Sequence, residues 1–247
     1  MRAADVLRDA RRVAVLTGAG VSTESGVPDF RGPQGVWSRF DPGEFEIGRL
    51  RADPRRFWTM RARLMREFAL DRARPNAAHD SLARAARSPR VLGIATQNVD
   101  GLHAAAGTPA DKLVELHGNA ANVRCMECGL VEPYSAVAEV AARGAVTCAA
   151  CGGVVKPDVV LFGEALPADA LRRAEEWARA SDAYVCIGSS LSVWPAAGLP
   201  VLAHERGARL VVVNEGPTDL DEVADVRIGG AVGVVVPALL AEAGLLP

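Results

Sequence analysis

The 247-residue sequence lacks a long uninterrupted apolar segment, and it lacks an excess of charge of either sign. Its most apolar stretch, residues 231–246, is interrupted by Pro237 and contains Glu242, which argues against a membrane-spanning helix. The first five residues include the charged Arg2 and Asp5 and no long apolar segment follows, so we expect no export signal. The net charge of −2 argues against a general binder of nucleic acid or of anionic membranes.

Cysteine is also scarce, but four of the five cysteines form two CxxC pairs, Cys125/Cys128 and Cys148/Cys151. Each pair supplies two thiolates from one tight turn, and the double spacing is typical of a tetrahedral Zn²⁺ site. Chance pairs or disulfides are the alternative. Because four protein ligands leave no open position, we expect a structural zinc, with the reactive groups elsewhere. Thiols committed to zinc and the absence of an export signal favour the cytoplasm.

Short apolar segments alternate with helical segments along much of the chain. The predicted strands are residues 13–16, 91–95, 159–162, 183–187, 210–213 and 226–228, and the clearest predicted helices are residues 78–86 and 168–180. Continuous apolar strands that alternate with helices indicate a parallel sheet covered on both faces. The expected fold class is therefore α/β, a Rossmann-like doubly wound sheet.

Four of these strands end in glycine-rich or polar residues. The ends are Gly18-Ala19-Gly20, Gln97-Asn98-Val99-Asp100, Gly188-Ser189-Ser190 and Asn214-Glu215. Ligands of open parallel sheets bind beyond the C-terminal strand ends. We therefore expect the four ends to share one crevice.

Two segments interrupt the alternation of strands and helices. Residues 35–75 start with aromatic and turn residues and continue into an arginine-rich helix, and residues 120–153 contain the cysteine pairs. We expect these insertions to form one small lobe, a helical insertion plus the zinc module. Residues 1–34, 76–119 and 154–247 then form the Rossmann-like domain.

The turn after the first strand differs from the fingerprint of a dehydrogenase. Gly18-Ala19-Gly20 allows the backbone to approach a pyrophosphate, but Thr23 stands where the third glycine is expected. The next clear strand comes only near Val91, so no second strand with a terminal acidic residue follows about 20 residues later. Residues 21–32 form a polar loop instead, and Phe30 within it is suited to shield a reactive carbon from water.

The motifs together resemble the sirtuin family of NAD-dependent protein deacylases, and they occur in the family's order over nearly the whole chain. They are Gly18-Ala19-Gly20-Val21-Ser22, residues 28–32 (PDFRG), residues 96–103 (TQNVDGLH), residues 115–118 (ELHG), the two CxxC pairs, residues 156–164 (KPDVVLFGE) and residues 188–191 (GSSL). The resemblance implies NAD as co-substrate, one structural Zn²⁺, and acylated-lysine proteins or peptides as partners. The implied activity is a protein-lysine deacetylase that transfers the acyl group to ADP-ribose and releases nicotinamide.

The resemblance also implies the roles of individual residues. His117 is the general base, and an imidazole that titrates near neutrality suits that role. Asn98 orients the ribose or a water molecule, and Asp100 binds the nicotinamide carboxamide. Among the other histidines, we expect His103 to brace the loop and His79 to have a mainly structural role at a helix N-terminus.

The expected cofactor and substrate contacts follow from the same resemblance. The cofactor-binding residues are Gly18, Ala19, Gly20, Ser22, Glu24, Asp29, Phe30, Arg31, Trp37, Gln97, Asn98, Asp100, Gly188, Ser189, Ser190, Asn214, Glu215 and Val232. The backbone around Val160, Phe162 and Gly163 is expected to pair with the extended substrate peptide by strand addition.

The acyl preference depends on Trp58 and Arg61. Some sirtuins bind the carboxylate of succinyl- or malonyl-lysine with a Tyr-x-x-Arg pair in this region, and residues three apart on a helix share a face. We therefore expect Trp58 and Arg61 to line the acyl tunnel. Trp58 lacks the phenol of that pair, and Arg61 has an alternative place on a solvated arginine-rich face. Deacetylation is thus the expected main activity, with desuccinylation or demalonylation as the alternative.

Two further alternatives use the same residues. One is a mono-ADP-ribosyltransferase of the same family. The other is a non-catalytic zinc protein that binds NAD or ADP-ribose, against which the presence of Asn98, Asp100 and His117 argues. The sequence leaves the oligomeric state open, and we expect neither a membrane nor a specific nucleic acid as partner.

Overall fold

The computed structural model describes residues 2–68 and 72–246. Residues 69–71, part of the predicted helical insertion, lie outside this description. The larger of two sheets has the strand order β3-β2-β1-β7-β8-β9, and all its neighbouring strands are parallel. Its strands are β1 (Val13–Thr17), β2 (Val91–Thr96), β3 (Leu113–Glu115), β7 (Ala183–Ile187), β8 (Arg209–Val213) and β9 (Val226–Ile228).

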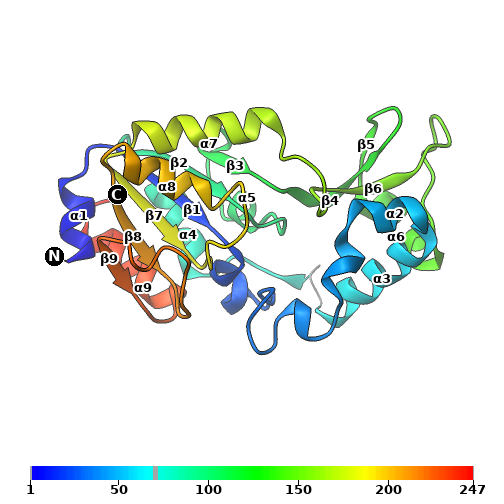
Figure 1. Cartoon of the computed structure of the whole chain (residues 1–247), viewed down its shortest axis with the longest axis horizontal. Coiled ribbons are helices and arrows are strands. Elements are labelled where there is room, and N and C mark those ends of the chain that lie inside the picture. The colour runs from blue at the N-terminus through cyan, green and yellow to red at the C-terminus, as the bar shows by residue number, and fades with distance from the viewer. Residues whose placement is uncertain (1, 69–71, 247) are drawn as a thin grey trace.

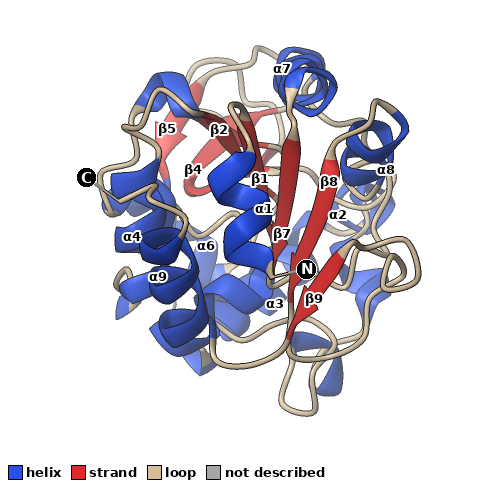
Figure 2. Ribbon diagram, turned by 90° about the vertical axis from the view of Figure 1, so that its left-hand side faces the viewer, coloured by secondary structure: helices blue, strands red, loops and turns tan. Residues whose placement is uncertain are grey.

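Helices cover both faces of this sheet because successive strand residues point to opposite sides. On β1, Val13 and Val15 face a cluster with residues of α1 (Ala3–Asp9), α4 (Ala77–Ala85) and α9 (Val232–Glu242). Ala14 and Leu16 face a second cluster with residues of α7 (Ala168–Ala180) and α8 (Gly198–Glu205). Figure 2 shows these two helical layers on opposite sides of the strands. The Rossmann-like fold class predicted from the sequence is confirmed.

The strand order reverses direction between β1 and β7. From β1 the chain adds β2 and then β3 on one side, and β7, β8 and β9 follow on the other side. Such a switch point leaves a crevice at the C-terminal strand ends, because the connections on its two sides leave in opposite directions. Gly18 and Gly188, which follow β1 and β7, lie at this point.

The smaller sheet is antiparallel and belongs to a second lobe (Figure 1). It has the order β5-β4-β6, with β4 (Gly118–Cys125), β5 (Val131–Pro133) and β6 (Val155–Val159). The helices α2 (Ile47–Ala52), α3 (Pro54–Glu67) and α6 (Tyr134–Arg143) lie beside it. Residues from both insertions share one apolar core, including Leu50, Phe57 and Val123.

Short helices connect these elements. They are η1 (Ala19–Ser25), η2 (Val36–Ser38), η3 (Pro42–Phe45), α5 (Leu102–Ala105) and η5 (Ala110–Lys112). Within the described ranges, no helix combines the length and the apolar character that crossing a membrane requires.

The expectation of a parallel-sheet strand at residues 159–162 was wrong. The strand in this region, β6, ends at Val159 and pairs with β4 of the small sheet. Residues 160–162 then connect the two lobes: Val160 N–H donates to His117 O at 2.8 Å, and Phe162 N–H donates to Phe45 O at 3.0 Å. An apolar run looks the same in sequence whichever sheet it joins. The place in the large sheet is taken by β3, which has only three residues.

The predicted domain boundaries stay a prediction. Both insertions contribute to the small lobe, yet β4 starts before residue 120 and β6 continues past residue 153. The antiparallel pair β4–β6 therefore extends toward the large sheet and connects the lobes with hydrogen-bonded backbone.

Candidate functional site: a cleft at the strand ends

A cleft of about 2210 Å³ is lined by residues from both lobes. All four predicted strand ends contribute to its wall, as the sequence predicted for a shared crevice. Of the predicted cofactor, substrate and catalytic residues, only Ser22 and Trp58 are absent from the wall. Ser22 is fully buried beneath the floor of the cleft.

The floor of the cleft consists of two glycine turns packed against each other. Gly18 N–H donates to Ile187 O at 2.9 Å, and Gly20 N–H donates to Gly188 O at 2.8 Å. A Cβ on Gly18 would lie 2.7 Å from the Cβ of Ser189, and Gly188 has a φ of +63°. Side chains are excluded here by contact and by conformation. The floor is thus backbone without side chains, in which the N–H groups of Gly18, Gly20 and Gly188 are bonded within the protein.

His117 reaches the cleft from the turn between β3 and β4. Its Nδ1 lies 2.7 Å from Gln97 O, so Nδ1 carries the proton and donates to that carbonyl. Nε2 is then unprotonated and available as a base. Burial lowers the pKa of His117, while the bond to Gln97 O acts in the opposite direction. The neutral ring is therefore the resting form near pH 7.

Asn98 and Asp100 lie together at the end of β2. The Asn98 amide donates to an Asp100 carboxylate oxygen at 3.2 Å and to Ser22 Oγ at 3.0 Å. Leu102 N–H donates to the other Asp100 oxygen at 2.9 Å. This polar group is rigid because each of its side chains has partners inside the protein. Gln97 donates from its amide to Ser189 Oγ at 2.9 Å and so connects two strand ends.

Aromatic rings form one wall of the cleft. Trp37 lies between Phe30 and Phe45, with ring centroids 5.0 Å from each, and Phe162 is 6.2 Å away. Phe30 remains 39% exposed. An exposed ring at the edge of an aromatic wall is suited to cover a ligand and exclude water.

The loop after β1 is connected to the start of α9 on the other side of the cleft. Glu24 accepts a hydrogen bond from Gly233 N–H at 2.8 Å, and a Cβ on Gly233 would lie 2.2 Å from a Glu24 carboxylate oxygen. Val232, next to Gly233, is buried and lines the cleft. Asn214 and Glu215 also line the cleft. The Asn214 amide donates to Gly216 O at 2.8 Å.

The segment expected to bind substrate peptide uses most of its own amides internally. The N–H groups of Val160, Leu161 and Phe162 donate to His117 O, a Glu164 carboxylate oxygen and Phe45 O. Gly163 follows with a φ of +87° and lines the cleft. Two of its carbonyl groups are used as well, since Glu164 N–H donates to Leu161 O and Ile47 N–H donates to Phe162 O, both at 3.0 Å. Strand addition to this segment is therefore restricted to Val160 O and to Gly163.

Trp58 lies in the core of the small lobe and not on the wall of the cleft. Its side chain is fully buried, and its indole N–H donates to Val155 O at 3.0 Å. Its ring stacks on Tyr134, with centroids 6.3 Å apart. The expectation that Trp58 and Arg61 both line the acyl tunnel therefore does not hold for Trp58. Burial explains the difference, because a large apolar ring gains more in the core than at a polar wall.

Arg61 does line the cleft, and Tyr134 lies beside it. The Arg61 guanidinium is 5.6 Å from the centroid of the Tyr134 ring. Its only hydrogen bond within the described part of the chain is a long one, 3.4 Å to Ala120 O, and its buried Nε has no partner there. Burial lowers the pKa of Arg61 to about 10. Sequence analysis missed Tyr134 because it stands between the cysteine pairs, and nothing in its local pattern connects it to residue 61.

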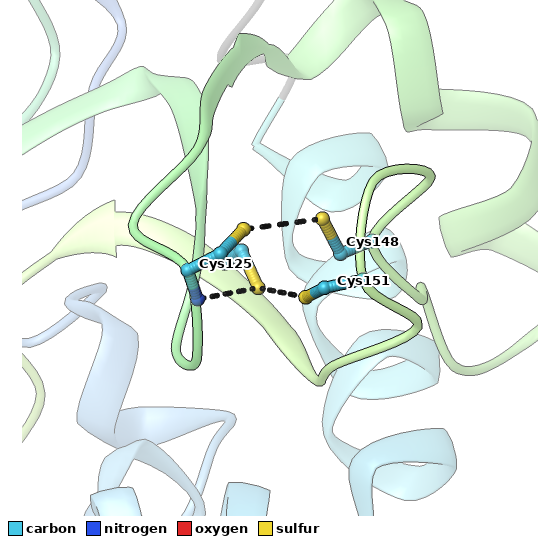
Figure 3. A group of neighbouring side chains, drawn as sticks. Cys125, Cys148 and Cys151 are labelled. Carbon is cyan, nitrogen blue, oxygen red and sulfur yellow. Dashed lines mark hydrogen bonds between the residues drawn. The ribbon is translucent and has the colours of Figure 1, made fainter.

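The four paired cysteines form one cluster whose sulfur atoms all lie within 4.8 Å of one another. Cys125 Sγ is 3.5 Å from Cys151 Sγ, and Cys128 Sγ is 3.7 Å from Cys148 Sγ. These distances exclude disulfides, whose S–S bond is about 2.05 Å. They match the edge of about 3.8 Å expected for sulfurs around one tetrahedral Zn²⁺. Figure 3 shows the labelled sulfurs converging on one point, so the cluster fits the predicted zinc.

The remaining histidines have the places expected from their sequence context. His79 is the third residue of α4 and completes a capping box with Asn76. His103 is buried on α5, with Nε2 2.8 Å from Thr17 Oγ1. The two rings are in contact, with centroids 4.9 Å apart. Burial lowers the pKa of both, that of His103 to about 3.

Because these histidines are buried, we expect the free energy of unfolding to fall as the pH is lowered through 6.5. Above that pH they are neutral in both states, whereas below it the unfolded chain binds protons that folded His103 does not bind until pH 3. At pH 5.5 this costs about 1.4 kcal/mol for His103. The measurement is the free energy of unfolding at pH 7.5 and 5.5. In His103→Gln the loss should be smaller by that amount, and an equal loss in both proteins would contradict the prediction.

Comparisons with known proteins agree with this geometry. The sequence model of the Sir2 family matches residues 18–195. An NAD-dependent protein deacetylase of Haloarcula marismortui is 46% identical over 241 residues, which covers 96% of this chain and 92% of the relative. One of Caldivirga maquilingensis is 44% identical over 227 residues, covering 91% and 86%.

A solved structure shares the fold over almost its full length. It is a Sir2 protein with a histidine-to-alanine substitution, in complex with a deacetylated p53 peptide and 3'-O-acetyl ADP-ribose. The TM-score is 0.90 with 35% sequence identity, and the match covers 99% of this chain and 98% of that one. The chain therefore belongs to the Sir2 family.

Proposed function

We propose that this protein is an NAD-dependent protein-lysine deacetylase. The single observation that carries the proposal is His117: its Nδ1–H is held by Gln97 O, so its free Nε2 faces a cleft at the topological switch point. Family membership supports the same activity, since the relatives above are named NAD-dependent protein deacetylases.

NAD, when bound, supplies the ribose carbon that the acyl-lysine oxygen attacks as nicotinamide leaves. In this proposal His117 Nε2 then takes the proton of a ribose hydroxyl, so that the acyl group can transfer to the sugar. Asn98 orients the ribose or a water molecule, and Asp100 accepts a hydrogen bond from the nicotinamide carboxamide. Phe30 and the aromatic wall exclude water, which would otherwise compete with the acyl-lysine.

The remaining cofactor contacts are proposed from the position of each residue in the cleft. The glycine turns and Ser190 take the phosphates, while Asn214, Glu215 and Val232 take the adenosine end. Substrate peptide would lie along Gly163 and the carbonyl group of Val160. A reducing compartment such as the cytoplasm suits the four thiolates, and zinc contributes only to the structure of the small lobe.

The test is incubation of the pure protein with NAD and matched acetyl-lysine and succinyl-lysine peptides. Nicotinamide and O-acyl-ADP-ribose are followed by mass spectrometry, and ADP-ribose attached to protein is measured in the same samples. Equal amounts of nicotinamide and O-acetyl-ADP-ribose support the proposal. ADP-ribosylated protein without deacetylated peptide would favour mono-ADP-ribosyl transfer, and binding of NAD without turnover would favour a non-catalytic role.

Arg61 favours a second candidate activity, removal of acyl groups that end in a carboxylate. A guanidinium at the cleft wall with a buried, unpartnered Nε is costly unless a ligand satisfies it. No carboxylate partner of Arg61 is present among the described residues. A succinyl or malonyl carboxylate would supply both the charge and the acceptor. The Tyr134 ring, 5.6 Å from the guanidinium, brings a phenol to the same part of the cleft wall, where Trp58 has none.

Replacing Arg61 by methionine should lower kcat/KM for a succinyl peptide by more than about tenfold, because a hydrogen bond to a charged group is lost. We expect kcat/KM for the acetyl peptide to change less than about threefold. Arg63→Met is the matched control, since Arg63 is on the same helix and pairs with Glu67 on the surface. Equal losses for both peptides would assign Arg61 to folding and remove the second candidate.

A further inference from the structure

Two oppositely charged side chains meet at the segment that connects the lobes. Lys156, on β6, places its Nζ 2.5 Å from a Glu164 carboxylate oxygen and 2.7 Å from Val159 O, and it donates to both. The two side chains are only 12% and 23% exposed. A pair with so little contact with water is costly to break, because removal of either partner leaves the other charge uncompensated.

Glu164 also closes the turn in which it stands. The carboxylate oxygen that contacts Lys156 accepts from Leu161 N–H at 2.9 Å, and Glu164 N–H donates to Leu161 O at 3.0 Å. Gly163, between them, has a φ of +87°, a backbone conformation that favours glycine. The turn is thus held from both ends as long as the carboxylate stays in place, and Lys156 is the cation that holds it there.

This turn presents the backbone groups with which a peptide could pair. Within the described residues of the segment, Val160 O and Gly163 are left for a partner strand, and both residues line the cleft. Val160 N–H donates to His117 O at 2.8 Å, so the same segment is bonded to the backbone of the proposed base. Lys156 is not among the described residues that line the cleft, so it can act on a peptide only through this segment.

We propose that Lys156 is a positioning residue for the substrate peptide: by holding the Glu164 carboxylate in the turn, it fixes the backbone groups with which the peptide pairs. The inference rests on the proposed function in assigning this segment to the peptide. Pairing through the backbone requires donors and acceptors in register, because a hydrogen bond weakens steeply with a poor distance or angle. A turn without its ion pair would have to be ordered by the peptide itself, which lowers the affinity.

Replacing Lys156 by methionine removes the cation and keeps a long apolar side chain. We expect KM and Kd for an acetyl-lysine peptide to rise about tenfold, because hydrogen bonds of a charged group are lost. KM for NAD and Kd for ADP-ribose should stay within about twofold, since the glycine turns of the cleft floor follow strands of the large sheet. Lys156→Arg should bind the peptide as the wild type does, because a guanidinium has several N–H groups for the same two acceptors. Binding is measured by calorimetry and KM by O-acetyl-ADP-ribose formation.

Arg124→Met is the matched control. Arg124 lies opposite Lys156 in the register of β4 and β6, and its Nε is 2.7 Å from an Asp158 carboxylate oxygen. The variant removes one cation from the same two strands without touching the turn, so KM for the peptide and KM for NAD should change less than about twofold. Equal rises of both KM values in Lys156→Met would overturn the proposal, because a general structural defect is not selective for the peptide. So would a wild-type affinity of that variant for the peptide.

Glu164 itself lines the cleft, so a direct contact with the peptide has to be separated from the effect of the ion pair. Glu164→Gln keeps an acceptor for Leu161 N–H and loses the charge, and it gives a test that does not depend on the folding of Lys156→Met. If the two residues act as one pair, each variant weakens peptide binding and the double variant weakens it no further. Additive losses would assign Glu164 to a direct contact and refute the positioning role of Lys156.

Binding and turnover together separate this inference from the proposed function. If the wild type binds the peptide and Lys156→Met shows the selective loss, but no deacetylation occurs, the positioning role stands and the proposed function fails. Deacetylation without the selective loss would have the reverse meaning. A wild type without affinity for the acetyl-lysine peptide would overturn both.

Discussion

Replacing His117 by alanine should lower kcat for deacetylation by about 10²–10⁴, the range for loss of a general base. The physical reason is the fixed tautomer: Nδ1–H is held by Gln97 O at 2.7 Å, so Nε2 is the free basic nitrogen that this ring presents to the cleft. Its neighbours Asn98 and Gln97 cannot substitute for it, since they have amides and not bases. The measurement is the rate of O-acetyl-ADP-ribose formation at saturating NAD and peptide.

The control for this variant is a step that comes before the base acts. Exchange of labelled nicotinamide into NAD requires the acyl-lysine attack but no proton transfer to His117, so exchange should remain within about tenfold of the wild type. His117→Gln, which retains a polar side chain without the basicity, should lose deacetylation to the same extent. Deacetylation at the wild-type rate in either variant would exclude His117 as the base.

Removing the zinc should unfold the small lobe and abolish activity, although no cysteine lies in the cleft wall. Two of the ligands, Cys125 and Cys148, are buried in the lobe's own core, so metal binding and folding are coupled there. In Cys148→Ala we expect substoichiometric zinc, a separate early unfolding transition and loss of turnover. Zinc content by plasma emission spectrometry and thermal unfolding by circular dichroism are the measurements.

Cys186→Ala is the matched control for the zinc prediction. Here the same substitution, cysteine to alanine, is made in β7. Cys186 is buried in the core of the large sheet and lies far in sequence from the cysteine cluster. This variant should keep one zinc per chain and its activity, with a stability loss of about 1 kcal/mol from the small cavity. Full activity of a zinc-free Cys148→Ala protein would contradict the structural role of the metal.

The sequence determined much of the large domain. Helix α7 and strand β7 have the predicted bounds, residues 168–180 and 183–187. The bounded apolar run of β7 and the amphipathic pattern of α7 are both local signals, so each of these elements can be located from its own residues. The cysteine spacing likewise indicated the metal cluster, because each pair of ligands comes from one turn.

The tertiary structure alone decided which distant residues meet. Trp58 stacks on Tyr134 and leaves Arg61 at the cleft wall, and residues 160–162 connect the lobes and do not join the large sheet. Local patterns contain no information on such contacts, because burial and backbone pairing depend on elements that are tens of residues apart. The types of residue at the site could thus be read from the sequence, whereas the tautomers, the partners and the wall they form required the fold.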